Sequence, residues 1–353
     1  MARRDDRASR IRSPGRASRS IAATLACVLA GCGGGGGGSG KPIDGAVDGA
    51  VDVDAAGLTW WQPSNEDNAN KNWDIQLSAP IDTSAPRVMY DLDLWSLVPS
   101  ATMLRYDDGS MVSVPAGALA GTIAALHART PSTIVICHVE TGILDLSLPD
   151  APKFPGYHAD ASKIPDQSPP EPGSVIGWHV GTSQKRWLDI RAASRAVLLP
   201  ILFRRFDLAA QIGCDGVEPD RNLAVEFEAQ TGWAPIDPHD SYSWFAELAK
   251  QGHARKLSTG MKNGHTLAGQ VDSEADTFDW MMVERCGEDQ LCDTTRPFIN
   301  LHKAVFAIDY DHNIIGDPQD SLFTCDQQAL AMIADGLVKD VGLSSAVRTQ
   351  CIP

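Results

Sequence analysis

Short β-rich runs alternate with helical segments from about residue 87 to the end of the chain. Eight runs are apolar enough to be buried strands. They span residues 87–95, 133–140, 186–190, 214–220, 257–262, 278–284, 304–310 and 338–343. Such alternation is typical of a parallel sheet whose strands are joined by crossover helices. Eight strands predict an α/β fold of the (β/α)8 TIM barrel type, which needs about 250 residues.

The segments between these runs have the composition of crossover helices. Helices are expected over residues 116–129, 192–211, 241–256 and 327–336. The segment 149–172 is rich in Pro and Asp and is longer than an average connection. It is therefore expected to form a functional loop after the second expected strand.

Polar residues gather where the expected strands end, the edge at which barrel enzymes hold their catalytic groups. The set comprises Asp91, Asp93, Glu140, Asp189, Glu218, Asp220, Lys262, Asn263, Glu284, Asp309 and Tyr310. A single acid after a strand is usually a helix cap or a solvated loop residue. Its repetition on six strands instead indicates a site.

Two carboxylates in the segment Asp215-Gly216-Val217-Glu218-Pro219-Asp220 share one face of a strand, because side chains alternate with a period of two. Acids held this close raise the cost of ionising both, so one can act as an acid and another as a base or nucleophile. The structural alternative is an ion pair in the barrel core, which Lys262 on the next strand could supply.

Glycoside hydrolysis needs two carboxyl groups, about 5 Å apart for retention and roughly 6.5 to 9.5 Å for inversion. Glu284 ends the apolar run Met281-Met282-Val283 and lies two strands beyond Asp220, so these two acids are the predicted catalytic pair. Trp187 and Tyr310, near strand ends, are candidate platforms for sugar rings, although aromatic side chains more often pack in the core.

The N-terminus resembles a lipoprotein signal. Arginines precede the apolar run 21–30, and Leu29-Ala30-Gly31-Cys32 resembles a bacterial lipobox, so residues 1–31 are the expected signal peptide and Cys32 the lipidated residue. Ordinary secretion with nearby cleavage is the alternative. Residues 32–57, rich in Gly and Asp, predict a flexible linker, and residues 58–353 the barrel domain. The expected location is the bacterial cell envelope, lipid-anchored through the N-terminus, or the exterior.

Six cysteines remain after Cys27 and Cys32, and export permits disulfides. Cys286 and Cys292 could close a local loop, and Cys325 and Cys351 could tie down the C-terminal tail. Cys137 and Cys214 are either buried thiols or a third bridge. The sequence has no His-Glu-x-x-His motif and no zinc-finger spacing, so neither a metal nor a cofactor is expected.

The charge balance opposes a nucleic-acid partner. The chain has 30 Lys and Arg against 45 Asp and Glu, a formal charge of -15. Phosphate backbones are bound by basic surfaces. An acidic surface favours solubility and would also attract a cationic polymer.

The chain resembles glycoside hydrolase family 114, the endo-α-1,4-polygalactosaminidases, from Trp61 to Asp311. An ordered set of motifs carries the resemblance: Tyr90-Asp91-Leu92-Asp93-Leu94, residues 136–142, Leu148-Pro149-Asp150-Ala151, Arg186-Trp187-Leu188-Asp189-Ile190-Arg191, residues 215–220, His253-Ala254-Arg255, Met261-Lys262-Asn263, Glu284-Arg285-Cys286 and Lys303-Ala304-Val305-Phe306.

The resemblance implies a barrel that cleaves α-1,4-linked galactosamine polymers, with Asp220 as the nucleophile and Glu284 as the acid/base. Matching motif positions imply that further residues orient the substrate or set the pKa values of the pair: Asp91, Asp93, Asp189, Glu218 and Lys262.

Four residues depart from the family pattern: Asp145 and Leu148 after the second expected strand, Arg221 where Asn usually follows the acid, and Gly264 where Asp usually follows Asn263. They keep two alternatives open. One is a noncatalytic carbohydrate-binding lipoprotein on a degenerate barrel, and the other is a hydrolase of a different glycan.

Overall fold

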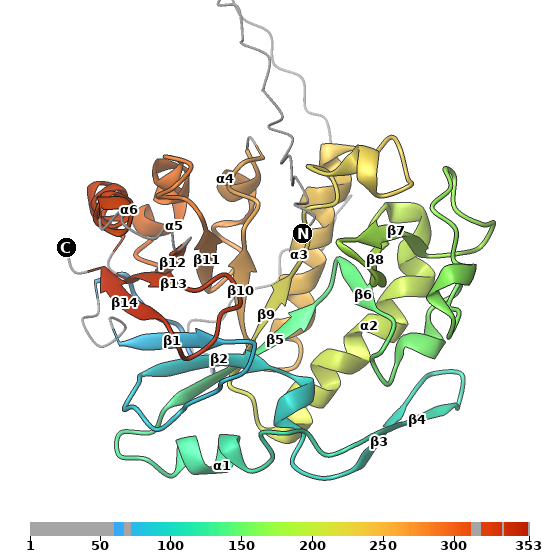
Figure 1. The fold of residues 1–353 in the computed structure, drawn as a ribbon, viewed down its shortest axis with the longest axis horizontal. Coiled ribbons are helices and arrows are strands. Elements are labelled where there is room, and N and C mark those ends of the chain that lie inside the picture. Colours follow the sequence, from blue (N-terminus) through green and yellow to red (C-terminus); the bar gives the residue numbers. More distant parts are fainter. Residues whose placement is uncertain (1–59, 67–71, 268, 312–318, 334, 352–353) are drawn as a thin grey trace, which may run out of the picture. The chain divides into compact units, whose positions relative to one another are not determined.

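The computed structural model describes residues 60–66, 72–267, 269–311, 319–333 and 335–351. Their main element is a sheet that curls into a nearly closed barrel (Figure 1). Its strands are, in spatial order, β1 (Trp73–Gln76), β2 (Met89–Asp93), β5 (Ile134–Glu140), β9 (Gly216–Asp220), β10 (Ser258–Lys262), β11 (Trp280–Glu284), β12 (Val305–Tyr310), β13 (Asp335–Lys339) and β14 (Arg348–Cys351). Strands β1 to β13 in this order pair in parallel, and β14 runs antiparallel to β13.

Side chains of β13 and β14 join these last two strands to β1. The guanidinium of Arg348 donates to the carbonyl of Trp73 from Nε at 3.0 Å and from Nη2 at 2.7 Å. Buried Lys339 forms an ion pair with buried Asp74 at 2.8 Å. These contacts close the gap that the strand ladder leaves.

One expected strand was wrong. Residues 186–190 do not enter the barrel, because β8 (Thr182–Leu188) pairs with β6 (Ile143–Asp145) and β7 (Ile176–Val180) in a separate antiparallel sheet. The barrel strand that the sequence missed is β1. It has four residues and follows a polar stretch, so it carries too little apolar pattern to stand out.

Helices cover the outer side of the sheet in Figure 1: α1 (Thr122–His127), α2 (Ala192–Ile212), α3 (Pro238–His253), α4 (Gln270–Glu274), α5 (Arg296–Asn300) and α6 (Gln319–Leu330). The expected helices 192–211 and 241–256 correspond to α2 and α3. The helix expected over 116–129 is shorter in the structure, where it is α1. The helix expected over 327–336 ends earlier, and the strand expected over 338–343 instead begins at Asp335.

Shorter elements complete the described chain. A hairpin of β3 (Thr102–Arg105) and β4 (Met111–Val114) follows β2. Single turns of 3-10 helix are η2 (Trp95–Leu97), η3 (Ala151–Lys153), η4 (Ala161–Lys163), η5 (Glu228–Gln230) and η6 (Cys292–Thr295).

The period-two alternation of the strands divides the apolar residues into two cores. The larger lies between the sheet and the helices. The smaller fills the barrel and is built of Trp73, Ile75, Met89, Ile136, Trp280, Met282, Ala304, Phe306, Ile308, Leu337 and Leu343. Its large rings belong to residues at the amino ends of β1, β11 and β12. The interior is therefore apolar at that end, which leaves the other end for polar groups.

Three disulfides fasten the elements. Cys137–Cys214 links β5 to the turn before β9, which resolves the alternative that the sequence left open. Cys286–Cys292 closes the loop after β11, and Cys325–Cys351 ties α6 to β14, as expected.

The expected signal peptide (1–31), Cys32 and the linker (32–57) lie outside the described residues. Within the described part of the chain, every helix is too short or too polar to cross a membrane.

Gly260 makes room for Trp280 inside the barrel. A Cβ atom at position 260 would lie 2.2 Å from the fully buried indole ring of Trp280. We expect Gly260→Ala to lower the free energy of unfolding by about 1 to 3 kcal/mol, because overpacking forces the ring to move. Urea denaturation measures this. Adding Trp280→Phe to Gly260→Ala should lower the free energy of unfolding by less than the sum of the two single changes. Strictly additive losses would contradict the steric cause.

Candidate active site

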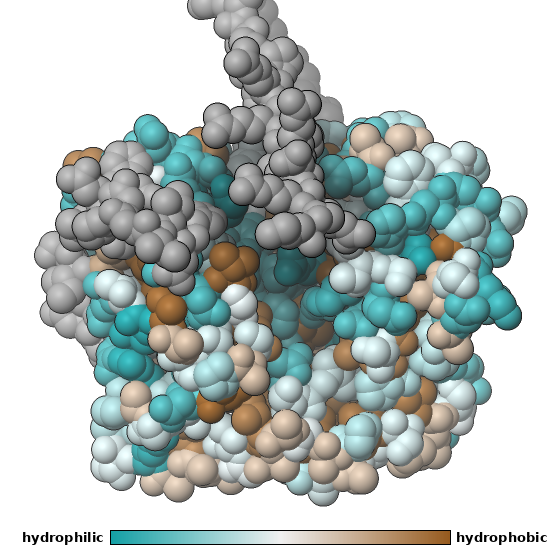
Figure 2. Space-filling view, in the orientation of Figure 1, coloured by the Kyte–Doolittle hydropathy of each residue, from teal (hydrophilic) through white to brown (hydrophobic). Residues whose placement is uncertain are grey.

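The carboxyl ends of the barrel strands line a cavity of about 250 Å³. Its residues are Leu77, Asp93, Trp95, His138, Glu140, Asp145, Leu148, Lys185, Asp220, Arg221, Glu284, Tyr310, Val341, Gly342 and Leu343. Figure 2 shows hydrophilic surface within a hollow on one face of the molecule. Polar groups therefore gather at the strand ends that the sequence indicated.

Lys262 at the end of β10 is the centre of the charge network. Its ammonium lies 2.7 Å from Glu218 Oε1, 3.7 Å from Asp220 Oδ2 and 3.9 Å from Glu284 Oε2. The side chain is buried, and the three carboxylates raise its pKa although burial alone would lower it. The cation is thus held between acids from the strands on both sides of its own.

His138 on β5 contacts the same two acids of β9. Its Nδ1 lies 2.6 Å from Glu218 Oε2, and its Nε2 lies 4.0 Å from Asp220 Oδ2. Burial disfavours the charged ring, but Glu218 and Asp220 together raise the pKa of His138 to about 9. Sequence reasoning missed this residue. The available signal was the alternation of Ile136, His138 and Glu140 on the inward face of an apolar strand.

The environment of Asp220 favours its charged form. Burial opposes ionisation, yet Lys262 and His138 hold the pKa of Asp220 at about 2. The backbone N–H of Arg221 also donates to Asp220 Oδ1 at 2.6 Å. At neutral pH this carboxylate is therefore ionised, as a nucleophile or base requires.

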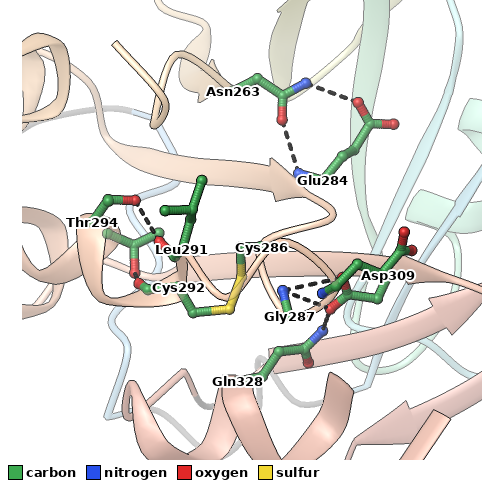
Figure 3. The surroundings of a disulfide bond; sticks show 11 residues. Asn263, Glu284, Cys286, Gly287, Leu291, Cys292, Thr294, Asp309 and Gln328 are labelled. Carbon is green, nitrogen blue, oxygen red and sulfur yellow. Dashed lines mark hydrogen bonds between the residues drawn. A yellow bond between two sulfur atoms is a disulfide. The ribbon is translucent and has the colours of Figure 1, made fainter. Parts of the chain in front are cut away.

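The hydrogen bonds that fix Glu284 at the end of β11 come from neutral partners. Asn263 Nδ2 donates to Glu284 Oε2 at 2.8 Å, and Asn263 Oδ1 accepts from the Glu284 backbone N–H at 2.8 Å (Figure 3). The Tyr310 hydroxyl donates to Glu284 Oε1. The following loop is held by the disulfide Cys286–Cys292, as Figure 3 shows, so the carboxyl group has a defined position.

The two carboxylates of the predicted pair lie close enough for glycosidic chemistry. One oxygen of Asp220 and one of Glu284 are both within 4 Å of Lys262 Nζ. These oxygens are therefore less than about 8 Å apart. This upper limit is compatible with the carboxyl separation of retaining glycosidases and with the shorter separations found in inverting ones.

Three strand ends carry an unusual backbone. Arg221, Asn263 and Arg285 directly follow Asp220, Lys262 and Glu284, and their φ angles are 65°, 54° and 64°. A left-handed conformation of a residue other than Gly costs of order 1 to 3 kcal/mol and clusters at functional sites. At each of these three positions the chain turns away directly after a charged side chain of the candidate site.

Asp91 on β2 lies beneath the cavity. It is fully buried, and neither carboxylate oxygen has a hydrogen-bond partner among the described residues. Burial and the nearby charge of Glu218 raise the pKa of Asp91 well above its usual range. One ligand atom each of Asp91, His138 and Glu218 lies within 4.8 Å of the others, a donor set suited to a metal. The Lys262 ammonium and the charged ring of His138 already supply positive charge there, which disfavours a metal cation.

The structure distributes the other predicted substrate-binding residues unevenly. Asp93 lines the cavity and accepts from Ser96 at the start of η2. Glu218 lies just below it. Asp189 and Trp187 do not line it: Asp189 binds Arg191 and Ser194 at the start of α2, and Trp187 stacks on Phe227 with 5.8 Å between ring centroids. They lie elsewhere because β8 belongs to the separate sheet.

The segment between β5 and α2 contributes to the cavity wall. The residues that line it are Asp145, Leu148 and Lys185, which flank the expected loop 149–172. Lys185 Nζ contacts Glu140 Oε1 at 2.6 Å. A fully buried ion pair between Asp150 and Arg205 of α2 anchors the segment at 2.7 Å. Three of the four departures from the family pattern, Asp145, Leu148 and Arg221, therefore face the cavity.

Three comparisons with known proteins were made with this chain. Residues 51–352 match the sequence profile of Glycoside-hydrolase family GH114. The crystal structure of Aspergillus fumigatus Ega3 in complex with galactosamine matches at 25% identity and a TM-score of 0.60, over 80% of this chain and 95% of that one. Morphinone reductase in complex with tetrahydroNAD matches at 10% identity and a TM-score of 0.39, over 76% and 82%, respectively. A search of curated proteins gives no match.

The raised pKa of His138 predicts a pH-dependent stability. Its folded-state value of about 9 exceeds the ordinary 6.5, so the stabilisation is fully present below pH 6.5 and is lost as the pH rises through 9. We expect His138→Gln to remove this part of the decline in the free energy of unfolding. Denaturation between pH 6 and 10 measures it, with exposed His302→Gln as the control. A decline as steep in His138→Gln as in the wild type would contradict the ionised state.

Proposed function

Because the chain belongs to glycoside-hydrolase family GH114, we propose that it cleaves α-1,4-linked galactosamine polymers within the chain, with Asp220 and Glu284 as the two catalytic carboxylates. One observation supports this pairing above all. An ionised aspartate held by Lys262 and a glutamate held by neutral Asn263 and Tyr310 line the same cavity.

We infer different roles for the two acids from their different surroundings. Asp220, with its low pKa, attacks the anomeric carbon as the glycosidic bond breaks, and Glu284 donates a proton to the leaving oxygen. A water molecule then gives a proton to Glu284 while its oxygen displaces Asp220, which leaves as a carboxylate. His138 and Lys262 keep Asp220 charged in the resting protein.

Charge and similarity support an amino-sugar substrate. The cavity is lined by Asp93, Glu140 and Asp145 in addition to the catalytic pair, and the chain carries a formal charge of -15. Protonated amines of a galactosamine polymer would be attracted to such a site. The similar structure of Ega3 holds galactosamine.

Arg221 favours a second candidate, a hydrolase of a different glycan. Its side chain is exposed at the cavity, with Nε 3.7 Å from Asp220 Oδ2. A fixed cation there would repel an amine on a nearby sugar, whereas a neutral or acidic glycan would be tolerated.

We expect Asp220→Asn and Glu284→Gln to fold normally and to lose hydrolysis of galactosamine polymer by about a hundredfold or more, because each change removes a catalytic carboxylate. Mass spectrometry of released oligosaccharides measures this, and circular dichroism checks the fold. Asp276→Asn, an exposed change in the loop before β11 and so at the opposite end of the barrel, is the matched control.

Full activity in either variant would contradict the assignment. A wild-type protein that cleaves another glycan in a substrate panel, but not galactosamine polymer, would support the second candidate. Binding of the polymer without any product would favour a noncatalytic carbohydrate-binding protein.

We further propose that the protein is exported and lipid-anchored in the bacterial cell envelope through Cys32, because Leu29-Ala30-Gly31-Cys32 resembles a lipobox. In a bacterial host given labelled palmitate, we expect the full chain to take up the label and Cys32→Ser to remain unlabelled. Cys27→Ser, within the apolar run, is the matched control and should keep the label. An unlabelled wild-type chain that appears in the medium would instead indicate ordinary secretion.

A further inference from the structure

A second pocket, of about 310 Å³, shares Glu284 with the active-site cavity. Its residues are Leu223, Glu226, Phe227, Asn263, Gly264, His265, Thr266, Glu284, Arg285 and Asp289. Asp220 lines the first cavity and not the second. Glu284 therefore lines both pockets, whereas Asp220 lines only the first.

We propose that this second pocket binds the amino-sugar unit on the leaving-group side of the cleaved bond. The inference rests on the proposed roles of Asp220 and Glu284. The sugar that Asp220 attacks must lie in the first cavity, and the oxygen that Glu284 protonates links it to the next unit. The second pocket, which Glu284 lines and Asp220 does not, is the site that we assign to that next unit.

Phe227 gives this pocket an apolar surface. Its ring is 39% exposed and stacks on the buried ring of Trp187, with 5.8 Å between centroids and an interplanar angle of 27°. An exposed aromatic ring on a fixed support offers a flat face for a sugar ring at little entropic cost. Trp187 thus acts through Phe227 rather than by contact with substrate.

His265 supplies an unused polar group. Its side chain is 8% exposed, and neither ring nitrogen has a hydrogen-bond partner among the described residues. A buried polar group without a partner is costly, so a hydroxyl group of a bound sugar would recover that free energy. Burial lowers the pKa of His265 to about 4, so the neutral ring offers one donor and one acceptor.

The acids of the pocket suit a protonated amine. Glu226 is exposed and has no ion-pair partner among the described residues, while Asp289 lies 3.5 Å from Arg285. Gly264 leaves no carboxylate at the position where the family pattern has Asp, so recognition of the amine falls to Glu226 and Asp289.

Phe227→Ala and Glu226→Gln in the full chain test the proposal with two substrates. The first is galactosamine polymer, whose leaving group fills the second pocket. The second is an oligogalactosaminyl α-fluoride, whose leaving fluoride does not reach it. We expect each variant to lower kcat/KM for the polymer about tenfold relative to kcat/KM for the fluoride, because only the polymer uses the contact. Glu228→Gln, two residues from Glu226 and outside the pocket, should keep the wild-type ratio.

The outcomes separate this inference from the proposed function. A wild-type protein that cleaves both substrates, with an unchanged ratio in both variants, overturns the second pocket as a sugar site and leaves the proposed function standing. A wild-type protein inactive on both substrates overturns the proposed function and the inference together. A tenfold lower ratio in the variants, but not in Glu228→Gln, supports the inference.

Discussion

The whole site depends on the buried ammonium of Lys262. Lys262 stands between Glu218 and Asp220 of β9 and Glu284 of β11, and burying these acids together without it would leave charges uncompensated at a cost of several kcal/mol. The contact requires the correct strand register, in which Ser258 pairs with Gly216 and Lys262 with Met282. Folding of the barrel and assembly of the site are therefore the same event. Gly216 and Gly260 permit it by leaving room around the interior side chains.

Much of the barrel was predictable because its strands are buried on both faces and stand out as apolar runs. The exceptions have physical causes. β1 is four residues long and gains its burial from Phe306 and Trp280, which are distant in sequence, so local pattern does not reveal it. The run 186–190 is equally apolar, but it buries that surface in the sheet of β6, β7 and β8. Apolar pattern predicts that a strand is buried, not which sheet it joins.

The prediction of site residues had the same limit, because the sequence does not say which sheet a strand joins. Asp220, Glu284 and Lys262 could be predicted because a strand end fixes both the position and the direction of a side chain. Asp189 and Trp187 were predicted by the same reasoning, but their strand lies outside the barrel, so they serve a helix start and an aromatic stack. His138 was missed because a single histidine in an apolar run is more often a core residue. Only the facing strand, with Glu218 opposite it, reveals its role.

A substitution at the centre of the cavity would lower the free energy of unfolding more than a substitution at its rim. At the centre, replacing His138 or Lys262 leaves a buried acid without its partner, which destabilises the fold as well as the chemistry. At the rim, Arg221 is exposed and Leu148 is half-buried, and changes at such positions usually alter stability by less than about 0.5 kcal/mol. The chain can therefore depart from its family at the rim without losing the carboxylate pair. Packing and charge compensation therefore constrain the carboxylate pair, whereas they leave the rim residues free to vary.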